Sequence, residues 1–285
     1  RPDTLVLLGD QVYADKTSAK VRRFLKHRRQ NGHHGPDTQV VGFEEYTKLY
    51  LESWRDPEVR WLFATVPSVM IFDDHELIDD WNTSASWRSD MNEQDWWVER
   101  ITAGLASYWV YQHLGNLSPG ERAEDRLWRR INGHDRAEPL DLTDTLDEFA
   151  ARCDAEPNHY RWSYCRDFSA VRLIVLDSRV ARDLTPSARG LLNEQELDWF
   201  DARMQGGFRH VLVATSLPFL LPLGLHHVEA WDEAIAQGAW GRPAARLGEQ
   251  LRRGLDLEHW AAFQNSFQAV ARIATELSDG ARGPA

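Results

Sequence analysis

The chain has 285 residues, of which 42% are hydrophobic and 27% charged, so it can bury a sizeable core, and disorder over most of its length is excluded. Its formal net charge of −11 would repel nucleic acid and anionic membrane surfaces, so no stable nucleic-acid partner is expected. There is no apolar run of about 18 residues or more, so no membrane span is expected, and two cysteines, Cys153 and Cys165, are too few for a disulfide framework or a structural zinc site. Oligomeric state and cellular location are left open.

Four short apolar segments, each followed at once by polar residues, are predicted to be buried strands. They cover residues 4–8, 68–72, 171–176 and 210–214. Helices are predicted at residues 18–30, 43–54, 94–114, 194–204 and 255–277, and surface connections at 32–39 and 115–138. Strands that alternate with helices indicate an α/β sheet, which binds ligands beyond the carboxyl ends of its strands. We therefore expect the four polar strand ends to share one crevice.

The two ends of the sequence suggest a piece of a longer chain. It begins with Arg1 and reaches a predicted strand almost at once, and residues 278–285 resemble a loop that leads onward. We expect a single domain over residues 1–285 that is incomplete at both ends.

The first strand runs into a segment rich in oxygen donors. Gly9 lets the backbone turn, and Asp10, Tyr13 and Asp15 follow it within six residues. Carboxylates suit hard cations, and tyrosinate is a ligand for iron in other settings. The alternative is an acidic turn that caps the next helix, but the combination favours a metal site.

The second strand runs directly into Asp73, Asp74, His75 and Glu76. Burying several acids without a counter-charge is costly, so a cation or an arginine is expected beside them. In the alternative interpretation, Asp73 caps a helix whose first turn is solvated.

The residues that follow the third and fourth strands indicate a particular function less specifically. Arg179, in Asp177-Ser178-Arg179, either grips a phosphate through its planar guanidinium or pairs with Asp177 or another nearby acid. The hydroxyls of Thr215 and Ser216 are expected to face the crevice. His226 and His227 are interpreted as packing residues, as are six tryptophans at positions 54, 61, 81, 87, 96 and 97.

In their order along the chain, these motifs resemble those of the alkaline phosphatase D (PhoD-like) family, which belongs to the calcineurin-like metallophosphoesterases. The Gly9-to-Asp15 segment is also similar to the Gly-Asp-x-x-Tyr-x-Asp element of purple acid phosphatases. The resemblance implies that Asp10 bridges two metal ions, that Tyr13 binds ferric iron, that Asp74 binds the second metal, and that His75 acts on the transition state. It implies a four-layer sandwich, in which two packed mixed sheets are flanked by helices.

The implied activity is hydrolysis of a small phosphate monoester or diester by a metal-bound hydroxide in a two-metal site, with Fe³⁺ and with Ca²⁺ or another divalent cation. His75 and Arg179 are the expected catalytic residues. The superfamily's first and last metal motifs would lie before residue 1 and after residue 285, so a non-catalytic remnant that binds without cleaving is the alternative. A serine hydrolase is excluded because the sequence has no Gly-x-Ser-x-Gly element.

Overall fold

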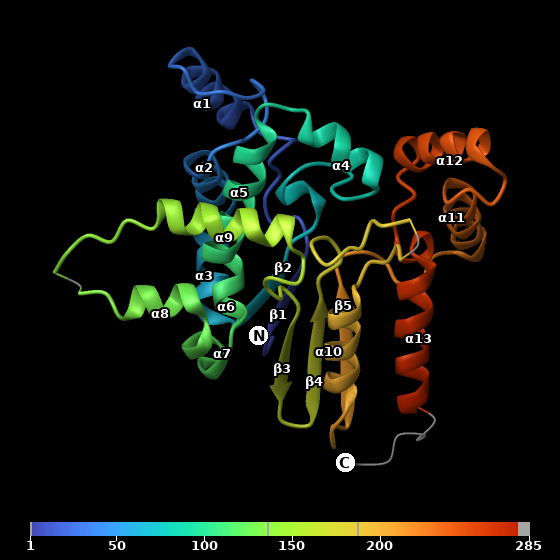
Figure 1. Cartoon of the computed structure of the whole chain (residues 1–285). Coiled ribbons are helices and arrows are strands. Elements are labelled where there is room, and N and C mark those ends of the chain that lie inside the picture. Colours follow the sequence, from blue (N-terminus) through green and yellow to red (C-terminus); the bar gives the residue numbers. More distant parts are fainter. Residues whose placement is uncertain (1, 136, 187, 279–285) are drawn as a thin grey trace. The chain divides into compact units, whose positions relative to one another are not determined.

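A computed structural model describes residues 2–135, 137–186 and 188–278 (Figure 1). The connection predicted at residues 279–285 lies outside the described residues. The chain divides into two compact units: unit 1 comprises residues 1–79 and 91–160, and unit 2 comprises residues 80–90 and 161–285. Each unit combines helices with a small sheet, so the predicted mixed α/β class is confirmed. In the described residues, no helix has both the length and the apolar character needed to cross a membrane.

Unit 1 consists of a two-stranded sheet and a set of helices. Its elements are β1 (Leu5–Leu8), α1 (Ala19–Gln30), α2 (Phe43–Trp54), α3 (Pro57–Thr65), β2 (Ser68–Ile71), the 3₁₀ turn η1 (Asp74–Glu76), α5 (Trp97–Tyr108), the π-helical turn η2 (Trp109–His113), α6 (Leu114–Asn116), α7 (Pro119–Glu124), α8 (Arg126–Asn132) and α9 (Thr143–Ala155). β1 and β2 are parallel, with Leu5 opposite Ser68 and Leu8 opposite Ile71. Helix α5 is buried over nearly all of its length and packs against α2 and α9, so it forms the centre of this unit.

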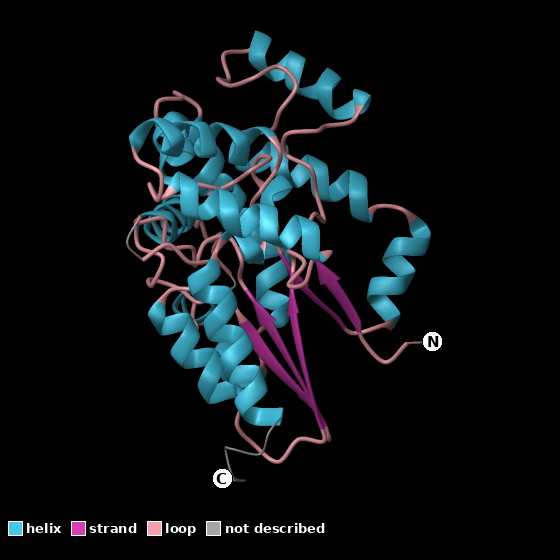
Figure 2. Cartoon of the chain, turned by 90° about the vertical axis from the view of Figure 1, so that its right-hand side faces the viewer, coloured by secondary structure: helices cyan, strands magenta, loops and turns pink. Residues whose placement is uncertain are grey.

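Unit 2 contains a three-stranded sheet in the order β3-β4-β5 (Figure 2). Its elements are α4 (Ala85–Asn92, whose last two residues belong to unit 1), β3 (Tyr164–Phe168), β4 (Val171–Leu176), α10 (Glu194–Met204), β5 (His210–Thr215), α11 (Leu223–Ala236), α12 (Arg242–Gly254), the 3₁₀ turn η3 (Trp260–Ala262) and α13 (Gln264–Ser278). β3 is antiparallel to β4, and β4 is parallel to β5, with Leu176 opposite Thr215. Ile174, Phe200, Trp260 and Phe263 are fully buried in the core of this unit.

Capping residues explain where several helices begin. The Ser18 side chain accepts the Val21 N–H at 3.2 Å at the start of α1, and Asn193 accepts the Glu196 N–H at 3.1 Å at the start of α10. All four predicted strands form to within one residue at either end, but the prediction that all of them are buried was wrong. β2 and β4 are largely buried, whereas β1 and β5 contain no buried residue. The predicted helices at 18–30, 43–54 and 194–204 are confirmed to within one residue.

Two predictions about longer segments were wrong. Residues 115–138 are not one surface connection, because they contain α7 and α8, and Ser118 with Glu121 forms a capping box that starts α7. Residues 255–277 are not one helix. Asp256 adopts a left-handed φ of 56°, and regular α-helix resumes only at Gln264 after the 3₁₀ turn.

Some elements had not been anticipated, namely α3, α4, α9, β3, α11 and α12. The predicted helix at 94–114 begins at Trp97 and widens into a π-helical turn at Trp109–His113. Parallel pairing brings the ends of β1 and β2 together, and likewise those of β4 and β5. A crevice shared by all four strand ends stays a prediction.

Candidate metal centre

The two strands of unit 1 end side by side and deliver their polar residues to one place. Leu8 lies opposite Ile71, and the Gly9 N–H donates to the Ile71 carbonyl at 2.9 Å. Gly9 and Asp10 then have left-handed φ angles of 95° and 53°, a conformation that is easy for glycine and costs an aspartate energy. The chain therefore turns sharply after β1, and Asp10 lies close to the residues that follow β2.

A buried carboxylate, that of Glu76, ties the two strand-end turns together. Its Oε2 accepts the N–H groups of Asp10 at 3.0 Å and Asp73 at 2.9 Å. Its Oε1 accepts the Gln11 N–H at 2.8 Å and the Gln112 side-chain amide at 3.1 Å. Burial raises the pKa of Glu76 to about 8, and the charge of Asp10 adds to the rise against the opposing backbone donors. The backbone around the acidic cluster is thus fixed by a residue that is not itself one of the predicted ligands.

Four of the five predicted site residues come together in this unit. Ligand atoms of Asp10, Asp74 and His75 all lie within 4.8 Å of one another, close enough to hold a metal ion. The Tyr13 hydroxyl donates to Asp10 Oδ2 at 3.4 Å, and its ring centroid lies 4.6 Å from that of His75. Burial raises the pKa of Tyr13, and the negative charge of Asp10 raises it further. This concentration of negative charge and oxygen donors fits a hard cation.

His75 is held from one side by a second carboxylate. Its Nδ1 lies 2.9 Å from Asp15 Oδ2, and its Nε2 lies 3.2 Å from Lys16 Nζ and 3.5 Å from Asp79 Oδ1. Burial alone would lower the pKa of His75, but the hydrogen bond to Asp15 and the charges of Asp15 and Asp74 outweigh it and raise that pKa to about 9. Asp15, His75 and Asp79 form a second group that could hold a metal. The sequence had placed Asp15 in the motif without revealing this partner.

The alternative of a solvated acidic turn after β2 does not describe the structure. Asp73 and Glu76 do form a capping box around η1, as that alternative supposed. Asp74 and Glu76 are nevertheless buried, with 8% and 3% of their surface exposed. Neither residue is therefore part of a solvated helix terminus. The charge of Asp74 needs compensation, whereas burial favours the protonated form of Glu76.

The fifth predicted residue, Arg179, lies in unit 2 and is engaged in a buried ion pair. Its guanidinium donates to both carboxylate oxygens of Glu258, at 2.7 and 2.6 Å, and to the Trp81 carbonyl at 3.0 Å. The Arg179 side chain is 1% exposed. The sequence had left open a pairing with Asp177 or another acid. Asp177 instead accepts backbone N–H groups, including that of Arg179 at 2.7 Å. A phosphate contact by Arg179 stays a prediction.

The third acidic group that could hold a metal lies in unit 2, and one of its members, Glu258, is paired with arginines. Ligand atoms of Asp80, Asp256 and Glu258 lie close enough to hold a metal. Glu258, however, already accepts hydrogen bonds from Arg179 and from Arg182, the latter at 3.2 Å. The positive charge that a buried acid needs is therefore supplied there by guanidinium groups.

A model of the PhoD-like phosphatase family matches residues 1–210, which is nearly three quarters of the chain. The chain belongs to the PhoD-like phosphatase family. No protein among the curated ones that were searched matches it. Among solved structures, the chain is similar to one of PhoD, with 15% sequence identity and a TM-score of 0.47 over 78% of this chain. The chain spans 37% of the length of that structure.

The matched part of this PhoD-like chain includes all five predicted site residues, and its acidic and histidine groups could hold metal. The remaining predictions concern unit 2 and the tryptophans. The Ser178 and Ser216 hydroxyls lie 2.7 Å apart at the adjacent ends of β4 and β5. His226 packs against Phe267, with ring centroids 4.8 Å apart, in agreement with a packing role. Most of the tryptophans named above are buried or half-buried, but Trp61 is 64% exposed and is not a core residue.

Proposed function

We propose that this PhoD-like chain belongs to an enzyme that hydrolyses small phosphate esters at the acidic cluster of unit 1. The observation that carries the proposal is the cluster itself. Asp10, Asp74 and His75 present ligand atoms within 4.8 Å of one another where two parallel strands end. Family membership independently supports phosphoric ester hydrolysis. Comparing the hydrolysis of a phosphomonoester with that of a phosphodiester distinguishes the two possible substrate types.

We further propose that the cluster holds two metal ions, Fe³⁺ together with Ca²⁺ or another divalent cation. Asp10 would bridge the two ions, Tyr13 would bind the ferric ion, and Asp74 would bind the other. When bound, these ions would supply Lewis-acid stabilisation of the phosphate and activation of water. The carboxylate and phenol oxygens are donors of the type that such cations prefer.

The protein's own side chains have separate tasks in this proposal. Asp15 accepts a hydrogen bond from His75 Nδ1, which fixes the ring, and Nε2 would donate a proton to the leaving oxygen of the ester in place of its present contact with Lys16. Glu76 keeps the two backbone turns in register through its contacts with Asp10, Gln11 and Asp73, so the ligands are positioned before substrate arrives.

We also propose that the two units make up one PhoD-like domain with the four-layer sandwich implied by the resemblance. One domain should unfold in a single cooperative transition that fluorescence and circular dichroism follow identically. Two separate transitions, each assignable to one unit by limited proteolysis, would refute the single-domain proposal.

The test of the proposed function combines elemental analysis with hydrolysis of a chromogenic phosphomonoester and a chromogenic phosphodiester. Asp10→Asn and Asp74→Asn should each lower metal content and reduce turnover by about 100-fold or more, because each removes a ligand charge and leaves the packing intact. Asp37→Asn, which changes an exposed acid in a connection of unit 1, is the matched control. A metal-free, inactive wild-type protein, or a fully active Asp10→Asn variant, would contradict the proposal.

The role of His75 is tested separately. His75→Ala should lower turnover by about 10²- to 10⁴-fold, the usual contribution of a general acid, while metal content stays close to that of the wild type. Loss of the metal in His75→Ala would instead make His75 a ligand.

A further inference from the structure

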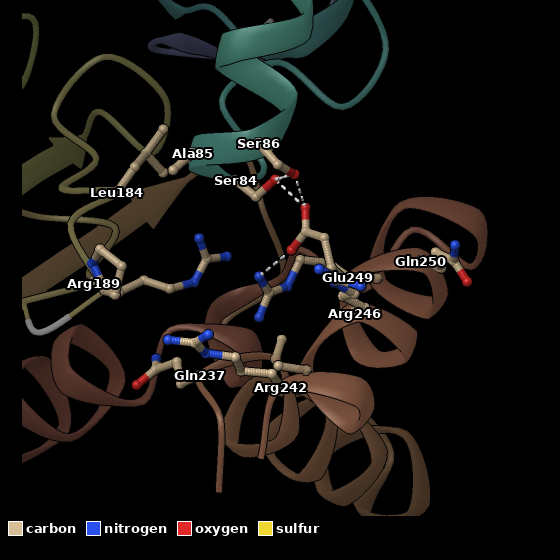
Figure 3. A pocket seen from close by; sticks show the side chains of 14 residues that line it. Ser84, Ala85, Ser86, Leu184, Arg189, Gln237, Arg242, Arg246, Glu249 and Gln250 are labelled. Atoms are coloured by element: carbon tan, nitrogen blue, oxygen red, sulfur yellow. Dashed lines mark hydrogen bonds and ion pairs between the residues drawn. The ribbon is translucent and has the colours of Figure 1, made fainter. Parts of the chain in front are cut away.

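Unit 2 contains a pocket whose lining includes none of the predicted site residues. It has a volume of about 510 Å³ and is formed by the start of α4, the segment that precedes α10, and helices α11 and α12 (Figure 3). Its size is in the range of small-molecule sites. Four arginines line it, namely Arg189, Arg242, Arg246 and Arg252, against a single acidic lining residue, Glu249. In a chain of net charge −11 such a concentration of cations calls for an explanation.

Two of these arginines are exposed, and neither has a counter-ion among the described residues. Arg242 and Arg246 lie one helical turn apart in the first part of α12. No carboxylate of the described chain lies within ion-pair distance of either guanidinium. Like charges four residues apart repel each other, and an anion bound between them would remove that repulsion. The first turn of α12 contains no acidic residue, so the positive end of the helix dipole adds to the same field.

The pocket's carboxylate does not neutralise them, because its oxygens are already engaged. Glu249 Oε1 accepts hydrogen bonds from the hydroxyls of Ser84 and Ser86, as Figure 3 shows, and Oε2 accepts from Arg252 at 3.0 Å. These contacts turn the carboxylate toward the start of α4. Arg242 and Arg246 are therefore left to face solvent in the pocket.

The floor of the pocket is a rigid, balanced ion-pair network. Arg189 and Arg252 are each 3% exposed and both donate to Glu233 Oε2, at 2.9 and 3.0 Å. Arg189 also donates to the Thr83 carbonyl at 2.7 Å. Asp232 is buried close to Arg252 and adds a further negative charge. Because the buried charges compensate one another, the excess positive charge resides on the two exposed arginines.

We propose that this pocket binds a small molecule that carries a phosphate group, with the phosphate held between Arg242 and Arg246. Two guanidinium forks present more donors than the two oxygens of a carboxylate can accept, whereas a phosphate dianion offers three terminal oxygens and two charges. Both arginines lie beyond residue 210, where the match to the family model ends. The pocket shares no lining residue with the metal cluster, so each can be tested by its own variants.

The experiment is titration calorimetry of the whole chain in a chelating buffer, which removes any metal from the cluster of unit 1. Inorganic phosphate and glycerol phosphate are the probes, and acetate at equal ionic strength represents carboxylates. Wild-type protein should bind both phosphate compounds with a Kd of a few millimolar or less, about ten times more tightly than acetate. Tighter binding of glycerol phosphate than of inorganic phosphate identifies an organic phosphate as the ligand, and equal binding identifies the free anion.

Arg242→Gln/Arg246→Gln should weaken phosphate binding by about tenfold or more, because it removes two charged donors. The matched control is Arg22→Gln/Arg23→Gln, which makes the same change in net charge on exposed arginines of α1 and should leave the Kd unchanged. Glu249→Gln should tighten binding, since it removes the one carboxylate among the described lining residues and keeps an oxygen for Ser84 and Ser86.

Three outcomes would overturn the proposal. The first is that the wild type shows no saturable binding of phosphate. The second is that the control and pocket variants bind phosphate equally weakly. The third is that acetate binds as tightly as phosphate. Circular dichroism spectra of the variants should match the wild type, because both substituted arginines are exposed. If the pocket variant failed to fold, the sign of the Glu249→Gln effect would decide, with unchanged or weaker binding counting against the proposal.

Discussion

Replacing Arg179 by glutamine should destabilise the protein, whatever its effect on catalysis. The substitution removes two charge-assisted hydrogen bonds to Glu258, each worth about 1.5–3 kcal/mol, and strands a carboxylate that is 3% exposed. Arg182 still reaches Glu258 at 3.2 Å, so part of the compensation survives. The free energy of unfolding should therefore fall by about 3–5 kcal/mol, the cost of breaking a buried ion pair.

The assay is urea unfolding followed by circular dichroism, with Arg179→Gln, Glu258→Gln and the double variant forming a double-mutant cycle. Arg272→Gln is the control, since its exposed i,i+4 pair with Glu276 in α13 should contribute only about 0.3–0.5 kcal/mol. A loss below about 1 kcal/mol for Arg179→Gln would refute the buried ion-pair reasoning. The predicted phosphate contact is tested by measuring the turnover of Arg179→Gln without urea, under conditions in which this variant is fully folded. Unchanged turnover would make Arg179 purely structural.

Three further predictions concern stability. Gly104→Ala in α5 places a Cβ 2.1 Å from Leu77 Cδ2, so overpacking should cost about 1–3 kcal/mol in urea unfolding, and an unchanged midpoint would contradict the tight packing. Asn193→Ala removes the cap of α10 and should cost about 1 kcal/mol by the same measurement. The hydrogen bond from His259 Nδ1 to Glu229, at 2.7 Å, raises the pKa of His259 against the effect of burial. Its stabilisation is therefore full below the unfolded pKa near 6.5 and is lost as pH rises through the folded pKa, so His259→Gln should destabilise more at pH 6 than at pH 9.

Local patterns in the sequence determined much of what was recognised. The four apolar runs are strands within one residue of their predicted limits, because runs of β-branched and other apolar residues favour strands and the polar residues that follow favour turns. Helix α2 and helix α10 begin and end where periodicity placed them. The order of the Gly9-Asp10, Asp74-His75 and Asp177-Ser178-Arg179 motifs was enough to indicate the family that the comparison with family models identifies.

Where local signals conflicted, the sequence was misread. The predicted helix at 255–277 followed an apolar stripe that is continuous in sequence, but a left-handed Asp256 interrupts it. Ser118 and Glu121 carry the sequence signature of the capping box that starts α7, but the charged residues around them are typical of a surface connection. Both errors come from weighing periodicity and composition above the chemistry of single turns.

Only the tertiary structure decided which side chains meet. Asp10 and Asp74 were expected to converge because parallel strands end at the same edge, yet the sequence could not reveal that Asp15 lies against His75, sixty residues away. The sequence could not show that Arg179 forms an ion pair with Glu258, or that Glu249 bonds to Ser84 instead of Arg242 and Arg246. The sequence alone does not distinguish a carboxylate that binds a metal from one that binds an arginine or a backbone turn. Its burial and its partners, which are set by contacts distant along the chain, determine which of these it does.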